Sequence, residues 1–199
     1  MKNNQPQPKL EPKKDVKETK PEVTKKEQTS AGTIRQFANG TKVGGYVMSN
    51  PAPQRKYIAL SKRAELYLKN TEGQGIVTSG AEGNHASGMI SHGNGNKIDV
   101  QGLDGARTTI TKYAQLCANF LKNSETAFVN LESFSSKEIS IVVDWLKQNT
   151  PNEYQIAMSK TSYSPGACIW NQGHVLCSAF TGLAKHLDIG IKPNAYFLD

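Results

Sequence analysis

Two short apolar runs, separated by a glycine-rich stretch, decide the fold: Gly-Ile-Val-Thr-Ser-Gly at 75–80 and Lys-Ile-Asp-Val-Gln at 97–101. Short runs of β-branched and apolar residues between turn-forming residues are typical of strands. The stretch between them is rich in Gly, Asn, Ser and His, and glycine lets the backbone turn tightly around polar side chains. The sequence therefore predicts two strands joined by a loop that carries polar chemistry.

Helices are expected on both sides of these strands. Residues 56–70 and 108–123 each place apolar side chains on one stripe among good helix formers. Ser135-Ser-Lys-Glu138 has the spacing of a capping box, so a third helix is expected to begin there and run through Leu146. Asn149-Thr-Pro151 is expected to end it.

Runs of β-branched and aromatic residues predict further strands. These are expected at 44–48 (a short edge strand), 126–131, 154–158 and 168–180, the last around His174. The C-terminal residues 183–199 are mixed in character and are expected to be peripheral. Strands that alternate loosely with helices predict an α+β domain, with a small, mostly antiparallel sheet, flanking helices and no internal repeat.

The first thirty residues differ from everything after them. They hold eight lysines, five acidic residues and four prolines, and no aromatic residue. Such a segment cannot bury enough apolar surface to offset its ordering entropy, so residues 1–30 are expected to form a disordered arm. Residues 31–199 are then a single α+β domain. The arm is either a solvated linker or a tether to nucleic acid or another polyanionic surface.

Charge and composition exclude some classes of protein. The chain has 199 residues and a net charge of +7, which favours polyanionic partners without identifying one. No apolar run is long enough to span a bilayer, and the N-terminus lacks the apolar core of a secretory signal. Cys117, Cys168 and Cys177 are odd in number and lack CxxC spacing, so we expect small core residues in a reducing compartment rather than disulfides. Dinucleotide, P-loop and α/β-hydrolase motifs are absent.

The spacing of histidines suggests a metal site. His85 and His92 lie seven residues apart in the glycine-rich stretch, and Asp99 follows seven residues later on the next strand. Zinc binds histidine nitrogen and carboxylate oxygen, and catalytic sites usually supply three protein ligands and leave one position open. His174, on a distant apolar strand, is the candidate third ligand. A histidine among Val175, Leu176 and Phe180 is also what a satisfied core histidine looks like.

Residues 91–99, Ser-His-Gly-Asn-Gly-Asn-Lys-Ile-Asp, resemble the S-x-H-x-x-G-x-A-x-D signature of zinc D-alanyl-D-alanine carboxypeptidases and L-alanyl-D-glutamate peptidases. This family has the hedgehog/DD-peptidase fold and includes many phage endolysins. His92, Gly95 and Asp99 match, Ser91 lies directly before the histidine, one position closer than in the signature, and Lys97 replaces the small alanine. The order of elements is also similar between about residues 56 and 180. The resemblance implies a zinc ion held by His92, Asp99 and His174 that acts on peptidoglycan stem peptides.

The chain departs from the family at positions that matter for catalysis. The family's general base lies three residues before the last histidine, where this chain has Asn171, and the position two before is Gln172. Neither side chain is a base. The family's oxyanion-binding arginine after Ser-Gly is replaced by Ala81-Glu82. His85 and Glu82 are the substitutes that the sequence offers, although a solvated loop histidine and a solvated turn glutamate are the simpler explanations.

Two hypotheses from different classes follow. In the first, the chain is a phage zinc peptidase that cleaves an amide bond of the cell wall, and its basic arm brings it to anionic wall polymers. In the second, it is a non-catalytic virion or interaction protein that keeps a degenerate peptidase fold and uses the arm to bind virion proteins or a polyanion. Both place the protein in the host cytoplasm or the virion, with action at the wall in the first case.

Overall fold

The computed structural model describes residues 32–82, 89–159, 175–177, 184–195 and 197. The first half contains β1 (Ile34–Ala38), β2 (Lys42–Val43), β3 (Tyr46–Met48), β4 (Tyr57–Ser61), α1 (Lys62–Lys69), β5 (Gly75–Ser79), β6 (Lys97–Gln101) and a 3-10 turn (Gly105–Arg107). The second half contains α2 (Ile110–Lys122), β7 (Thr126–Glu132), α3 (Ser136–Asn149), α4 (Pro151–Ser159), β8 (Val175–Cys177) and β9 (His186–Ile191). The predicted arm therefore lies wholly outside the described residues, and the predicted strand around His174 lies partly outside them.

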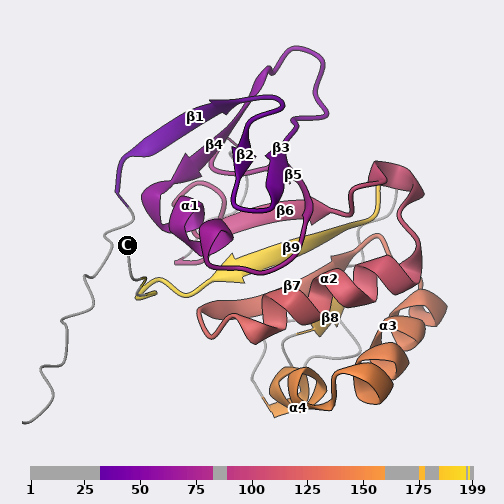
Figure 1. The fold of residues 1–199 in the computed structure, drawn as a ribbon. Coiled ribbons are helices and arrows are strands. Elements are labelled where there is room, and N and C mark those ends of the chain that lie inside the picture. Colours follow the sequence, from indigo (N-terminus) through magenta and orange to yellow (C-terminus); the bar gives the residue numbers. More distant parts are fainter. Residues whose placement is uncertain (1–31, 83–88, 160–174, 178–183, 196, 198–199) are drawn as a thin grey trace, which may run out of the picture.

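The described strands form a seven-stranded sheet in the order β2-β3-β5-β6-β9-β7-β8 and a separate pair, β1 and β4. Two neighbouring pairs in the large sheet, β3 with β5 and β7 with β8, are parallel, and the other four are antiparallel. The fold is thus mixed α and β, with a mostly antiparallel sheet as predicted. Figure 1 shows β9 in yellow between β6 and β7, with α2, α3 and α4 grouped beside this half of the sheet.

Several elements lie where the sequence predicts them. The strands at 75–79, 97–101 and 126–132 and the helix at 110–122 are confirmed. Thr109 caps that helix by accepting a hydrogen bond from Lys112 N. The capping box at the start of α3 is also confirmed, because Ser135 and Glu138 each bond the other's backbone N–H.

The helix predicted over 56–70 is wrong in its first part. Residues Tyr57–Ser61 form β4, which pairs antiparallel with β1, and the helix begins only at Lys62. Ser61 accepts a hydrogen bond from Ala64 N and so caps the helix at that point. Both segments are apolar on the inner side, so the periodicity of the sequence does not separate a strand from the helix that follows it.

The strand predicted at 154–158 is also wrong, because these residues belong to α4. Pro151 does end α3, but it also occupies the first turn of α4, where its missing N–H costs no hydrogen bond. Helix α4 packs against α2 and α3, and Ala157 is buried there. Packing against two helices, rather than local β propensity, decides the conformation of this segment.

The C-terminal segment is not peripheral. Residues His186–Ile191 form β9, which lies between β6 and β7 in the interior of the sheet. Its apolar residues, Leu187, Ile189 and Ile191, are fully buried in the main core. The sequence His-Leu-Asp-Ile-Gly-Ile alternates with period two, which is the pattern of a strand with one face in the core. The segment is short and mixed in composition, and the prediction missed the alternation.

Gly190 of β9 is closely packed against Phe128 of β7. Gly190 pairs with Lys97 on one side and with Phe128 on the other, and a Cβ at this position would come 2.4 Å from the Phe128 ring. We expect Gly190→Ala to lower the free energy of unfolding by about 1–3 kcal/mol, because the ring must move within a packed sheet. Urea unfolding measures it. In the control, Gly93→Ala, the new methyl group meets nothing within 4 Å, and a change of less than about 0.5 kcal/mol is expected. Equal effects in both variants would contradict the prediction.

Candidate metal centre

The two faces of the central strands differ sharply in chemistry. Successive side chains of a strand point to opposite faces. One face of β5, β6, β9 and β7 supplies the main core, through Val77, Ile98, Val100, Leu187, Ile189, Ile191, Val129 and Leu131. The alternate residues of β6, β9 and β7 are mostly polar, and they share the opposite face. Polar side chains from distant parts of the sequence therefore meet on one face of the sheet.

The strand register aligns these polar residues in rows. Asp99 of β6 lies opposite Asp188 of β9, which in turn lies opposite Asn130 of β7. In the neighbouring row, His186 of β9 lies opposite Glu132 of β7. Asp188, Asn130 and Glu132 are buried. The backbone of three adjacent strands (Figure 1) thus fixes the relative positions of four ionisable groups and an amide.

The loop before β6 is held by asparagine side chains. Asn94 Oδ1 accepts hydrogen bonds from the backbone N–H groups of Ser91 and Asn96. Asn96 donates to Met89 O at 2.7 Å and accepts from Arg63 Nη1 at 2.6 Å. These bonds replace the backbone ladder that a loop lacks, and they fix the position of His92 within it.

His92 is buried and held by both ring nitrogens. Its Nδ1 lies 3.0 Å from Gly80 O and its Nε2 lies 3.3 Å from Asp99 Oδ1. A carbonyl oxygen only accepts hydrogen bonds, so Nδ1 carries a proton and Nε2 is the atom presented to Asp99. Burial lowers the pKa of His92, but the hydrogen bond and charge of Asp99 outweigh burial and raise the pKa above its usual value. The same contacts hold the pKa of Asp99 below its usual value against the effect of burial.

His186 has a similar arrangement on the other side of Asp99. Its Nδ1 lies 2.8 Å from Ala184 O, so this ring also presents Nε2 to the polar face. Nε2 is 3.9 Å from Asp99 Oδ1 and 4.0 Å from Glu132 Oε2. In metal sites, a ligating histidine commonly donates its second ring N–H to a backbone carbonyl, which fixes the orientation of the ring.

Asp188 is the most deeply buried carboxylate of the group, with 2% of the residue exposed. Its Oδ2 forms an ion pair with Lys97 Nζ at 2.6 Å. Its Oδ1 has no hydrogen-bond partner among the described residues, although buried polar atoms are nearly always paired. Burial raises the pKa of Asp188, and the charge of Asp99 adds to that rise although Lys97 opposes it. Asp188 therefore has an unsatisfied oxygen in a buried environment that disfavours its ionised form.

Glu132 is the last residue of β7 and lies near the carboxylates of Asp99 and Asp188. Its Oε1 accepts a hydrogen bond from Asn130 Nδ2 at 2.9 Å. Burial, and then the charge of Asp188, raise the pKa of Glu132 above its usual value. Ser133, which follows, has a φ of 65°, a left-handed conformation that is uncommon outside glycine. Backbone strain of this kind is concentrated at functional sites.

Three of these residues have the geometry of a metal-binding group. His92, Asp99 and Asp188 each offer one ligand atom, and the three atoms lie within 4.8 Å of one another. Imidazole nitrogen and carboxylate oxygen are ligands that zinc accepts. The unsatisfied Oδ1 of Asp188 fits the same interpretation, because a buried carboxylate oxygen without a hydrogen bond is what a bound cation would satisfy. A divalent cation therefore fits the residues present.

The predicted site residues have different outcomes. His92 and Asp99 are brought together, as the sequence predicts. His85, His174 and Asn171 lie outside the described residues. Glu82 is a half-buried turn residue. It accepts hydrogen bonds from the backbone N–H of Gly80 and of Ala59, and so joins the end of β5 to β4.

The sequence prediction missed four residues of the group: Lys97, Glu132, His186 and Asp188. His186 and Asp188 fall in the segment taken as peripheral, and a correct assignment of β9 would have placed both on its polar face. Glu132 lies one residue beyond the predicted end of β7. Such residues can be found by looking for a strand in which polar residues at alternate positions lie between apolar residues.

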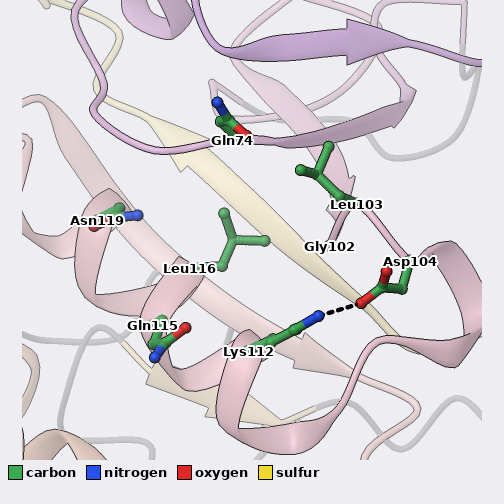
Figure 2. A pocket seen from close by; sticks show the side chains of 8 residues that line it. All are labelled: Gln74, Gly102, Leu103, Asp104, Lys112, Gln115, Leu116 and Asn119. Atoms are coloured by element: carbon green, nitrogen blue, oxygen red, sulfur yellow. Dashed lines mark hydrogen bonds and ion pairs between the residues drawn. The ribbon is translucent and has the colours of Figure 1, made fainter.

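A surface pocket lies apart from this group. It has a volume of about 240 Å³ and opens beside α2 and the loop after β6, next to the Lys112–Asp104 ion pair of 2.6 Å. Figure 2 shows Gln74, Leu103, Leu116 and Asn119 around it, together with this ion pair. None of its lining residues belongs to the polar face described above. The pocket therefore adds nothing to the metal centre.

Cys117 is buried in the core with no disulfide, as predicted, and burial raises the pKa of its thiol far above its usual value. None of the described helices is long and apolar enough to cross a membrane.

Comparisons with protein-family models, with curated proteins and with solved structures found no match to this chain.

Proposed function

We propose that this protein is a hydrolase of amide bonds that uses a divalent metal ion, zinc being the first candidate. The observation that carries this proposal is the buried group of His92, Asp99 and Asp188, whose ligand atoms lie within 4.8 Å of one another. Two of the three belong to the motif that resembles the zinc peptidases. The donor set supports zinc, because a histidine with carboxylates is common in catalytic zinc sites.

In this proposal each ligand has a structural reason to face the ion. His92 presents Nε2 because Gly80 O holds its Nδ1, and Asp188 presents Oδ1 because Lys97 holds its Oδ2. Asp99 lies between them on β6. A bound zinc ion would supply a Lewis acid that polarises an amide carbonyl and acidifies a water. Three protein ligands would leave room for substrate or water, as catalytic sites require.

Glu132 is the proposed general base. The family's base position holds Asn171, which cannot accept a proton at neutral pH, so the role must fall to another residue. Glu132 is a carboxylate at the edge of the group, and burial raises its pKa above the usual value, which is the direction that suits a general base. Its other neighbour, His186 Nε2 at 4.0 Å, can pass a proton on to a leaving amine.

The substrate is proposed from the motif at 91–99. This motif resembles that of enzymes that cleave peptidoglycan stem peptides, so we propose a wall peptide as substrate and a phage as the source. The basic segment at the N-terminus, with eight lysines, would bring the protein to anionic wall polymers or to virion proteins. In that role the protein would act at the cell wall from the host cytoplasm or from the virion.

Digestion of purified peptidoglycan tests the proposed activity. The full chain is stripped of metal, reloaded with zinc, and incubated with wall material while released amino groups are counted. We expect amine release from the reloaded protein and none after chelation. Zinc binding without any release would contradict the enzyme and favour the alternative, a non-catalytic virion or interaction protein that keeps the metal as a structural element.

Variants of three residues decide the third ligand. The sequence predicts His174, whereas the described residues favour Asp188. We expect Asp188→Asn to lose zinc, and His174→Ala and His186→Ala to keep it, with His186→Ala impaired only in hydrolysis. Loss of zinc in His174→Ala alone would restore the set His92, Asp99 and His174 and contradict the role of Asp188.

A further inference from the structure

Lys97 brings a positive charge into the metal centre itself. Its Nζ lies 2.6 Å from Asp188 Oδ2, and only 17% of its side chain is exposed. The ammonium also lies 5.9 Å from the centre of the Phe128 ring, a distance at which a cation is attracted to an aromatic face. Lys97 is thus positioned by both Asp188 and Phe128. It pairs with Gly190 of β9, where the absence of a side chain leaves space for the Phe128 ring.

The charges of the polar face explain why a cation is needed there. Asp99, Asp188 and Glu132 bring three carboxylates, and Lys97 brings an ammonium that pairs with one of them, Asp188. With neutral histidines, three negative charges and one positive charge leave an excess of two negative charges. One divalent cation balances that excess, whereas two would leave a buried excess of positive charge, which is costly.

We propose that Lys97 is a built-in cation that occupies the place of a second metal ion, so that the site takes one divalent cation and binds it less tightly than its carboxylates alone would. This inference rests on the proposed metal centre. It assigns Asp188 a bridging role, with Oδ1 toward the metal ion and Oδ2 on Lys97. Lys97 acts on the metal only through Asp188 and through its charge, so it is a positioning residue.

Zinc titration of the metal-stripped full chain, in competition with a chromophoric chelator at fixed pH and salt, tests this inference. Lys97→Met removes the charge and keeps the length of the side chain, and Lys97→Gln removes the charge but keeps a hydrogen-bond donor for Asp188. We expect both to bind zinc at least about tenfold more tightly than the wild type, because a cation no longer competes for the carboxylates. Lys97→Arg keeps the charge and is expected to bind as the wild type does.

Lys112→Met is the matched control, because Lys112 also forms a 2.6 Å ion pair with an aspartate, Asp104, but away from the metal centre. It should leave zinc affinity unchanged. Circular dichroism checks that each stripped variant is folded, and if Lys97→Met is not, Lys97→Gln decides. The inference is overturned if neither neutral variant binds more tightly, or if the wild type takes two zinc ions.

Failure of the inference and failure of the proposed function give different results. One tightly bound zinc ion in the wild type with unchanged affinity in the neutral variants overturns the role of Lys97 and leaves the metal centre standing. No binding in the wild type but binding in Lys97→Met supports the competition by Lys97 and contradicts a native metal enzyme. No binding in any variant overturns both.

Discussion

Replacement of Glu132 by glutamine is expected to lower amide hydrolysis by about two to four decades, the usual loss when a general base is removed, while zinc content stays the same. The amide keeps the size of the side chain and an oxygen that can accept the hydrogen bond from Asn130. It cannot accept a proton. Rates of amine release from wall peptides and zinc analysis of the same samples measure the two effects.

Glu125→Gln is the matched control for this variant. Glu125 precedes β7 by one residue and lies away from the metal centre, and its backbone carbonyl accepts a hydrogen bond from Lys192 N. We expect its activity to equal that of the wild type. Full activity in Glu132→Gln would exclude Glu132 as the base, and loss of zinc in that variant would mean that Glu132 is a ligand.

Replacement of Asp99 by asparagine is expected to weaken zinc binding by at least about 100-fold. Changes to residues that merely support metal ligands cost about 10-fold to 100-fold, so loss of a charged ligand should cost no less. Asp99 lies 3.3 Å from His92 Nε2 and 3.9 Å from His186 Nε2, at the centre of the group. Isothermal titration with zinc measures the affinity.

The stripped Asp99→Asn variant is expected to stay folded. Its neutral amide removes one of three neighbouring carboxylates and so relieves repulsion with Asp188 and Glu132. Asp104→Asn, at an exposed carboxylate just after β6, is the control and should bind zinc as the wild type does. Unchanged affinity in Asp99→Asn would remove this residue from the metal centre.

Local signals in the sequence predict much of the fold. The strands at 75–79 and 97–101 and the capping box at 135–138 depend on residues within a few positions of one another, and all three are confirmed. The errors at 57–61 and 154–158 have a common cause. Pairing with β1 in one case and packing against α2 and α3 in the other come from distant residues, which propensity alone does not include.

The candidate metal centre was predictable only in part, for the same reason. His92 and Asp99 belong to one short motif, so the sequence brings them together. Asp188 and His186 reach the site because β9 lies between β6 and β7 in the sheet. These two residues are almost ninety positions from Asp99 in the sequence. Glu132 comes from a third strand. Residues on three strands share a face only once the order and register of those strands are known.

Zinc analysis of the purified full chain, wild type against His92→Ala, tests the central claim most directly. His92 is buried, is held by Gly80 O, and is common to the motif and to the observed group. We predict one zinc ion per wild-type chain after stripping and reloading, and none in His92→Ala. Equal zinc in the two proteins, or none in the wild type, would contradict a metal centre at this face of the sheet.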